Sequence, residues 1–359
     1  MKKIGIMSMQ RVVNYGSFMQ SYALKNMIQS IDKDFDVEFV DFNIDSPLVK
    51  DKLKYYKKIK RNKNLINFLK KRKVNKLFAH KYDLYLKKIG VTSKKNYNPS
   101  DIDTLVIGSD EVFNCMQDLP IGYSKELFGY HYFDKNVISY AASFGNTTLD
   151  QLKKYNVDSE IGEMLSNFKS ISVRDSNSYH IVKTLCQKNI SLNLDPVLIW
   201  DFSNIKDVQI KLKNYIILYV YPGRLSRKEE AAIKKFAKNH DKKIITLGMY
   251  QRIADDNTPL DDPFSIFSYF KNADYVITDT FHGSIFSIKS HTKFCSIIRD
   301  SNSNKLNDLL ITLKQNDRIA TNIDYIEKLY NTDCDFMKSD NIIKTEREKA
   351  IKYLSTNLK

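Results

Sequence analysis

Short apolar segments alternate with segments of helical periodicity along most of this chain, and no other feature restricts the fold as strongly. Residues 3–7 (KIGIM) form an apolar run, residues 16–27 carry apolar side chains at helical spacing, and residues 37–42 (VEFVDF) form a second run. A strand, a helix and a strand in this order require a crossover connection, which makes the two strands parallel neighbours in one sheet. The sequence therefore predicts an α/β fold.

The alternating strand-like and helix-like segments fall into two units of similar organisation. The further apolar runs of the first unit lie at residues 103–108, 137–142, 170–174 and 189–194. Asp195-Pro196 ends this unit, because proline is disfavoured both inside a helix and in a centrally paired strand. The apolar runs of the second unit lie at residues 215–220, 243–247, 273–278 and 294–298. We predict a helix over 226–239 and expect 294–298 to be the last strand.

A length of 359 residues suits two domains better than one. We predict two Rossmann-like domains that face a cleft. Their bounds are residues 1–205, with a basic helical insertion at 50–95, and residues 206–335, followed by a C-terminal helix at 336–359. Ligands of open parallel sheets bind beyond the carboxyl ends of the strands, so polar residues that follow the strands are the candidates for a site.

The insertion at 50–95 is dense in Lys and Arg, with aromatic, Leu and Ile residues between them. One explanation is an inserted, exposed helix whose charged side chains interact only with water. The alternative is docking on an anionic membrane surface, because Lys and Arg beside apolar side chains are typical of interfacial helices. Nucleic-acid binding ranks third, since no recognised binding motif accompanies the charge, and we expect no nucleic-acid partner.

The net charge of +15 favours anionic partners, although a composition rich in Lys, Asn and Ile produces such a charge without any function. No apolar stretch reaches the 18 residues of a membrane-spanning helix, and the first apolar run is too short for a signal peptide. The four cysteines are widely spaced without a Cys-x-x-Cys pair, which argues against a disulfide framework or a zinc site. We expect a cytoplasmic protein without a metal or other cofactor.

Polar candidates follow two strands of the first unit. Asn14 and Gly16 lie where the first run passes into a helix; glycine allows close approach of a ligand, and a helix N-terminus favours anions. A plain tight turn explains them equally well. Ser109, Asp110 and Glu111 follow another run and suit either a helix cap or the binding of hydroxyl groups.

Arginines are the candidates for binding an anion. Arg174 ends the run 170–174, where a planar guanidinium can hold a phosphate or carboxylate through two hydrogen bonds. A surface pair with Asp175 or a helix cap explains it equally well. The weaker candidates are Arg224, Lys289 and Arg299.

The segment TDTFHGSIFS (278–287) places His282 and Gly283 between a strand and a helix. An imidazole exchanges protons near pH 7, although a lone histidine more often makes a structural hydrogen bond. The sequence leaves open whether the carboxylate of Asp279 reaches His282. GxGxxG, Walker, GxSxG and HExxH motifs do not occur, which disfavours nicotinamide, P-loop, hydrolase and metalloprotease chemistry.

Taken in order, NYGSFMQSYAL, IGSDEVFN, SYAASFG, ISVRDSNSYHIVKTL, NLDPVLIW and TDTFHGSIFSI resemble the polysaccharide pyruvyl transferase family. The resemblance covers residues 1 to about 320, apart from the basic insertion. It implies a fold similar to that of GT-B glycosyltransferases. It also implies transfer of a pyruvyl group from phosphoenolpyruvate onto two hydroxyls of a sugar in a cell-surface polysaccharide or its lipid-linked precursor, at the inner face of the membrane. The products are a ketal and phosphate.

The resemblance also assigns roles to residues. The histidine of the family's last motif falls on His282, which would be the general acid, and the arginine of its VRD motif falls on Arg174, which would hold the donor's phosphate or carboxylate. The other candidates for substrate binding are Asn14, Gly16, Ser109, Asp110, Glu111, Thr280, Gly283 and Arg224.

Three positions depart from the family pattern. Thr280 stands where members often carry arginine, so a contact to the donor anion is missing or comes from elsewhere, such as Arg224 or a lysine. Glu111 and Phe113 stand where the pattern has Gln and Trp. Two alternatives therefore remain: a GT-B-type glycosyltransferase that uses a nucleotide sugar, or a non-catalytic glycan- or membrane-binding relative.

Overall fold

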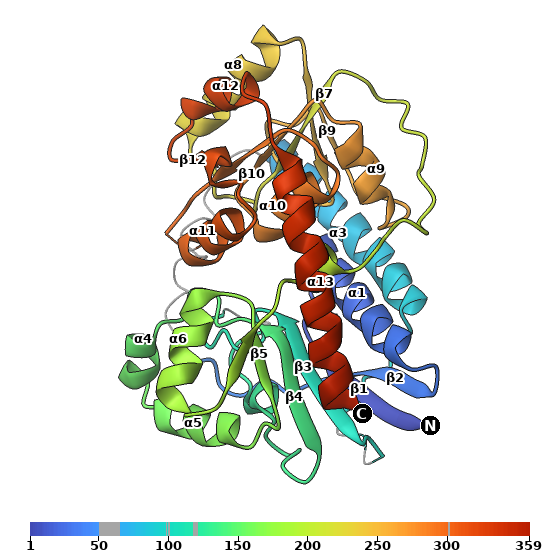
Figure 1. Cartoon of the computed structure of the whole chain (residues 1–359). Helices are drawn as coiled ribbons and strands as arrows, with labels where there is room; N and C mark the ends of the chain where they lie inside the picture. Colours follow the sequence, from blue (N-terminus) through green and yellow to red (C-terminus); the bar gives the residue numbers. More distant parts are fainter. Residues whose placement is uncertain (50–64, 98, 100, 118–120, 301) are drawn as a thin grey trace.

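The computed structural model describes residues 1–49, 65–97, 99, 101–117, 121–300 and 302–359. Its named strands form two six-stranded sheets, and all neighbouring strands in both sheets are parallel. Figure 1 shows one sheet in each half of the molecule, with helices packed around it. The α/β prediction with two Rossmann-like sheets is confirmed.

The first sheet has the strand order β2-β1-β3-β4-β5-β6. Its strands are β1 (Lys2–Met7), β2 (Phe35–Val40), β3 (Thr104–Asp110), β4 (Asn136–Ala142), β5 (Ile171–Val173) and β6 (Ile190–Leu192). Its helices are α1 (Tyr15–Ile31), α3 (Leu65–Lys88), α4 (Leu149–Lys154), α5 (Asp158–Ser166), α6 (Ser176–Leu185) and α7 (Pro196–Ile199), with the 3-10 turn η1 (Lys125–Phe128). Six of the seven residues of β3 are buried, which explains why this run is apolar throughout instead of alternating.

The second sheet has the order β12-β11-β10-β7-β8-β9, the doubly wound arrangement in which the first strand lies at the centre. Its strands are β7 (Tyr215–Tyr219), β8 (Lys243–Leu247), β9 (Asp256–Thr258), β10 (Tyr275–Thr278), β11 (Phe294–Ile297) and β12 (Ile319–Ala320). Its helices are α8 (Arg227–Asn239), α9 (Ser265–Lys271), α10 (Phe281–Lys289), α11 (Ser303–Thr312), α12 (Tyr325–Tyr330) and α13 (Phe336–Leu358), with the 3-10 turn η2 (Asn316–Arg318).

Two strands of the second sheet were not predicted from the sequence. The expectation that 294–298 is the last strand is wrong, because β12 pairs with β11 through Ile319 and Ala320. At the opposite edge, β9 has the polar sequence Asp-Asn-Thr and pairs with β8. β9 has no apolar residue and β12 only two residues, so neither has an apolar pattern to be recognised from the sequence.

The basic insertion contains the long helix α3 (Figure 1). Residues 50–64 of the predicted insertion lie outside the described residues. Across the part of the chain that the structure describes, no helix combines the length and the apolar character needed to cross a membrane. The buried face of α3 carries Phe78, Tyr82 and Tyr85, which join the same apolar cluster as Tyr15 and Phe18 of α1.

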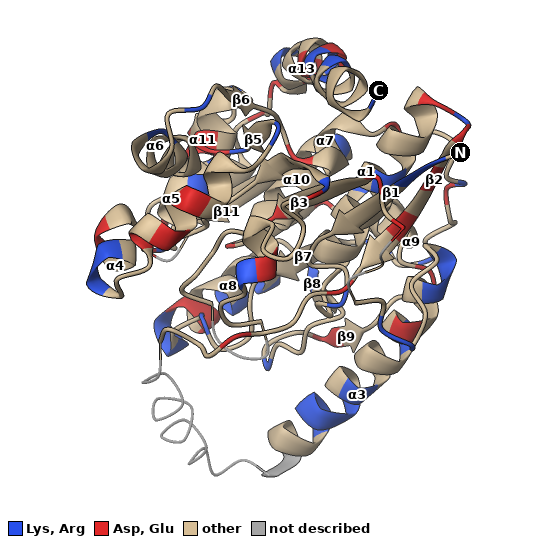
Figure 2. Cartoon of the chain, turned by 90° about the horizontal axis from the view of Figure 1, so that it is seen from below, with Lys and Arg blue, Asp and Glu red and all other residues tan. Residues whose placement is uncertain are grey.

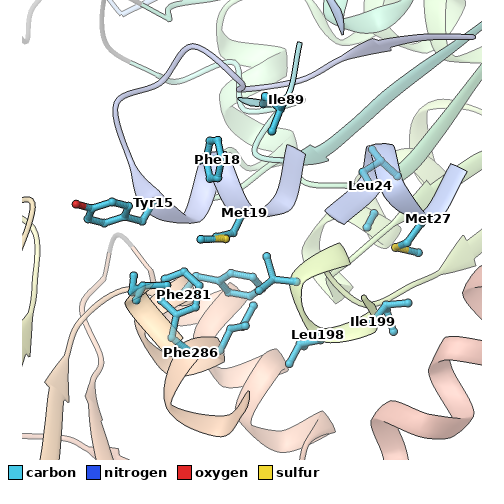
Figure 3. Close-up of a cluster of buried hydrophobic side chains, with 14 of the residues drawn as sticks. Tyr15, Phe18, Met19, Leu24, Met27, Ile89, Leu198, Ile199, Phe281 and Phe286 are labelled. Carbon is cyan, nitrogen blue, oxygen red and sulfur yellow. The ribbon is translucent and has the colours of Figure 1, made fainter. Parts of the chain in front are cut away.

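One apolar cluster joins the two halves of the molecule. Figure 3 shows Met19 of α1 opposite Phe281 of α10, and Leu198 and Ile199 of α7 near Met27. All five side chains are buried. This packing brings the N-terminus of α1, from the first half, against the N-terminus of α10, from the second.

The last helix, α13, returns from the second half to the first sheet, where the two chain ends lie close together (Figure 1). The hydroxyl of Tyr353 donates a hydrogen bond to the carbonyl of Ser139 in β4 at 2.8 Å. Leu354 and Leu358 are fully buried, and Nζ of Lys2 donates to the carbonyl of Leu358 at 2.7 Å. The helix therefore attaches the end of the chain to its beginning.

Replacing Leu354 with Ala should destabilise the protein by about 2–5 kcal/mol, because the truncation leaves a cavity beneath α13. The measurement is the free energy of unfolding by urea. Thr356→Ala, an exposed position on the same helix, is the matched control and should change the free energy of unfolding by less than about 0.5 kcal/mol. Equal stability of both variants would contradict the anchoring role of α13.

Candidate active site

The N-termini of α1 and α10 meet between the two sheets. Asn14 caps α1, because its Oδ1 accepts a hydrogen bond from the N–H of Gly16 at 2.7 Å. Thr280 caps α10, because its Oγ1 accepts from the N–H of Gly283 at 2.9 Å. A Cβ atom at Gly16 would lie only 2.2 Å from Nδ1 of His282. A side chain at position 16 therefore has no room beside the imidazole.

Arg174 and His282 face the same carboxylate. Nη1 of Arg174 lies 3.0 Å from Oδ2 of Asp195, and Nη2 lies 3.5 Å from Oδ1 of Asp110. Nε2 of His282 lies 3.6 Å from the same Oδ2 of Asp195. The guanidinium carbon of Arg174 also lies 4.2 Å from the ring centroid of Phe281, a cation–π contact, and the side chain is only 1% exposed. Asp195 thus links a guanidinium of the first half to an imidazole of the second.

Electrostatics keep Asp195 ionised. Burial alone would raise the pKa of its carboxyl group, but the facing His282 and the guanidinium of Arg174 outweigh burial and lower that pKa. Nε2 of His282 and Nε of Arg174 have no hydrogen-bond partner among the described residues. Both nitrogens are buried, so the closed arrangement leaves one polar atom of each side chain unsatisfied.

Glu111 forms an ion pair that crosses between the two halves. Its Oε1 contacts Nζ of Lys305, which comes from α11 of the second half. Its Oε2 accepts a hydrogen bond from Nδ2 of Asn114 at 2.7 Å. Burial would raise the pKa of Glu111, but Lys305, Arg174 and Asn114 outweigh it and lower the pKa to about 2. The negative charge of Glu111 is therefore compensated from both halves.

Asp279 is buried but faces a different group of cations. Its Oδ1 accepts a hydrogen bond from the N–H of Tyr221 at 3.1 Å. Its Oδ2 lies 3.9 Å from Nη1 of Arg224 and 3.8 Å from Nε of Arg299, too far for hydrogen bonds. These three atoms, and Nη2 of Arg299, lack a hydrogen-bond partner among the described residues. Burial raises the pKa of Asp279. Two guanidiniums with unused donors therefore gather where β7, β10 and β11 end.

The structure places most sequence candidates at this junction. The group around Asp195 includes His282, Arg174, Gly16, Asp110 and, beside them, Glu111. Asn14, Thr280 and Gly283 form the caps of the two facing helices, and Arg224 belongs to the Asp279 group. Ser109 lies apart, because its buried hydroxyl donates to Oε1 of Gln20 at 2.7 Å. Lys289 also lies apart and donates to the carbonyl of Trp200 at 3.0 Å.

Two residues of the site escaped the sequence analysis. From the sequence, Asp195 was interpreted only as part of the Asp-Pro pair that ends the first unit. It nevertheless follows a predicted strand closely, as do the polar residues that were named as candidates for the site. The carboxylate that faces His282 is that of Asp195 and not that of Asp279. Lys305 gave no signal, because it lies on an ordinary helix and meets Glu111 only through the packing of the two halves.

The site is closed in this structure. The side chain of His282 is 9% exposed, and Gly16 packs against its ring. A cavity of about 300 Å³ lies elsewhere, beside Arg11, Asp41 and residues 90–96. Among the described ranges, no group of three His, Cys, Asp or Glu side chains is arranged to hold a metal ion.

Comparisons with known proteins agree with this architecture. A model of the polysaccharide pyruvyl transferase family matches residues 14–301. No curated protein matched the sequence. Among solved structures, the chain is similar to a putative UDP-N-acetylglucosamine 2-epimerase from Listeria monocytogenes (TM-score 0.52, 11% identity, 96% of this chain and 90% of that chain covered).

Two further structures show the same likeness. They are the UDP-GlcNAc 2-epimerase of Methanocaldococcus jannaschii (TM-score 0.52, 11% identity, 96% and 99% covered) and the glycotransferase of kitacinnamycin (TM-score 0.53, 10% identity, 100% and 99% covered). At these identities the likeness shows the fold alone. That fold is the GT-B-like arrangement of two Rossmann-like domains expected from the sequence.

Replacing Glu111 with Gln should make stability less dependent on pH. The pKa of Glu111 falls from 4.5 to about 2 on folding, so its stabilisation is complete above pH 4.5 and is lost as the pH falls toward 2. The variant should be less stable than the wild type by about 3 kcal/mol at neutral pH. Because Glu111 becomes protonated in the unfolded wild type, this difference should shrink by about 2 kcal/mol between about pH 6 and pH 3.

The measurement is urea unfolding of both proteins across this pH range. Glu163→Gln is the matched control, because Glu163 is exposed on α5. A difference between wild type and Glu111→Gln that stays constant with pH would show that the ion pair with Lys305 does not set the charge of Glu111.

Proposed function

Because the chain belongs to the polysaccharide pyruvyl transferase family, we propose that it transfers a pyruvyl group from phosphoenolpyruvate onto two hydroxyls of a sugar. The sugar belongs to a cell-surface polysaccharide or its lipid-linked precursor, and the products are a cyclic ketal and phosphate. The observation that supports this most is the meeting of His282 and Arg174 at Asp195, between the two sheets.

In this proposal His282 is the general acid. Its imidazolium gives a proton to the methylene carbon of phosphoenolpyruvate, and positive charge develops at carbon two. One sugar hydroxyl attacks this carbon, phosphate leaves with the electrons of its C–O bond, and the second hydroxyl closes the ketal ring. Of the two hydroxyl protons, one restores His282 and the other leaves with phosphate. Asp195 orients the imidazole, and a closed site keeps water from taking the place of the sugar.

The donor's phosphate needs cations that Thr280 cannot supply. Arg174 is already paired with Asp195 and Asp110, and among the described residues only its Nε lacks a partner. Arg224 and Arg299 flank Asp279, the residue directly before Thr280. Nη1 of Arg299 pairs with Glu229 at 2.7 Å, but its Nε and Nη2, and Nη1 of Arg224, have no hydrogen-bond partner among the described residues. We assign the phosphate to these two guanidiniums, which take over the role of the arginine found in other family members.

The acceptor is the reason to place the protein at a membrane. A sugar carried on a lipid is presented at the membrane surface, so an enzyme that modifies it gains from binding there. The proposal therefore includes a peripheral position at the inner face of the cytoplasmic membrane. The helix that carries the basic residues, α3, is the element suited to this contact.

Replacing His282 with Ala should lower turnover by about 10²–10⁴-fold, because the proton donor is lost. The measurement is phosphate release from phosphoenolpyruvate in the presence of a lipid-linked sugar. His180→Ala, at an exposed position of α6, is the control and should retain full turnover. Unchanged turnover in His282→Ala would remove this residue from the mechanism. Thermal stabilisation by UDP, but not by phosphoenolpyruvate, would favour a glycosyltransferase instead.

Replacing Arg299 with Gln should raise the KM for phosphoenolpyruvate by about 10- to 150-fold, since a hydrogen bond to a charged group contributes about 1.5–3 kcal/mol. The same change at Arg224 should act in the same direction. Arg252→Gln is the matched control, because Arg252 is exposed and pairs with Glu230 away from Asp279. A KM equal to that of the wild type in both variants would place the phosphate elsewhere.

A further inference from the structure

We propose that α3 holds this protein on an anionic membrane through a row of leucines flanked by lysines. Leu69, Leu77 and Leu84 are 53%, 40% and 48% exposed. They are separated by eight and seven residues, about two helical turns each, and therefore lie along one side of the helix. In the docked state these leucines enter the lipid, and the lysines meet the headgroup phosphates.

The opposite side of α3 is fixed to the body of the protein. Phe78, Tyr82 and Tyr85 are buried, and the ring of Phe78 lies 4.8 Å from that of Tyr15 in α1. The hydroxyl of Tyr85 donates to the carbonyl of Leu260 in the second half. The helix thus has one face anchored in the apolar cluster, and the leucine row belongs to another face that is open to the surroundings.

Basic side chains accompany the leucine row. The helix contains eight Lys or Arg residues and a single acidic one, Asp83. Figure 2 shows blue segments along α3 at the rim of the molecule. Lys70, Lys73 and Lys76 are exposed, and none of them has an ion-pair partner in the described ranges. Ion pairs with the second half occupy Lys81, which contacts Asp261, and Lys88.

The combination of leucines and lysines identifies the partner. Lysines alone would suit any polyanion, including a nucleic acid. Exposed leucines contribute nothing to a contact with phosphate groups but gain free energy when they leave water for lipid. Lysine stems can lie along the apolar region while their ammonium groups reach anionic headgroups. An anionic bilayer satisfies both kinds of side chain at once.

The position of α3 connects this surface to the site. Tyr15, which packs on Phe78, is the neighbour of Gly16, the residue against the imidazole of His282. Docking through α3 therefore holds the N-terminus of α1 near the bilayer, where a lipid-linked sugar is presented. The purpose of docking rests on the proposed function, whereas docking itself can be measured without any substrate.

The test is flotation of the full chain with vesicles of phosphatidylcholine alone or with about one third phosphatidylglycerol. We expect recovery with the anionic vesicles only. The triple variant Leu69→Ser/Leu77→Ser/Leu84→Ser should lower the partition coefficient about tenfold or more. Lys70→Gln/Lys73→Gln/Lys76→Gln should lower it by a similar factor, since each lysine near an anionic surface contributes to binding.

Matched triple variants elsewhere provide the controls. Val208→Ser/Ile311→Ser/Met337→Ser removes three exposed apolar side chains, and Lys234→Gln/Lys235→Gln/Lys238→Gln removes three exposed charges from α8. Both should float like the wild type, and circular dichroism should show that all variants are folded. Equal recovery with neutral vesicles, or equal losses in the control variants, would overturn the proposal. So would binding of an RNA 40-mer that competes with vesicles and does not depend on the leucines.

Phosphate release with a lipid-free sugar acceptor separates this inference from the proposed function. The leucine variant should retain that activity while it loses vesicle binding. Vesicle binding without any phosphate release in the wild type would refute the proposed reaction and leave docking intact. Full phosphate release without vesicle binding would refute docking alone.

Discussion

A single buried carboxylate, that of Asp195, connects the fold to the site. Its Oδ1 caps α7 by accepting a hydrogen bond from the N–H of Val197 at 3.0 Å, which leaves Oδ2 for Arg174 and His282. A buried carboxylate without cationic partners costs several kcal/mol. Arg174 comes from the same half as Asp195 and already pairs with it at 3.0 Å, whereas His282 comes from the second half, so the packing of the two halves places the imidazole beside the guanidinium. The packing that joins the two halves is therefore also what assembles the site.

Much of the fold could be predicted because its central strands are buried on both faces. Such strands need continuous apolar runs, and β1, β3 and β10 each show one. Two helix starts were also expected, after Asn14 and near His282, and the structure shows them capped by Asn14 and Thr280. The edge strands β9 and β12 could not be predicted, because β9 (Asp-Asn-Thr) has no apolar residue and β12 has only two residues.

The site was predictable only where a residue follows a strand within the same unit. His282 and Arg174 fulfil this condition. Asp195 fulfils it too, although the sequence analysis interpreted it only as the end of the first unit. Lys305 does not fulfil it, because its contact with Glu111 depends on how the second sheet packs against the first. Even the close approach of Gly16 to His282 joins residues more than 250 positions apart. Contacts across the junction are a property of the assembled halves, and no local pattern in the chain encodes them.

The balance of charge at the junction explains how Thr280 can stand where an arginine is common. Asp195 and Asp110 offset Arg174, and Glu111 offsets Lys305, so neither cation adds free positive charge. Arg299 pairs with Glu229 at 2.7 Å, but the carboxylate between Arg299 and Arg224, that of Asp279, lies 3.8–3.9 Å from both, and burial raises its pKa. An anion placed between these guanidiniums would exchange two weak contacts for hydrogen bonds and would favour protonation of Asp279. In the proposed reaction, these guanidiniums at the strand ends would supply the contact to the donor anion that Thr280 does not.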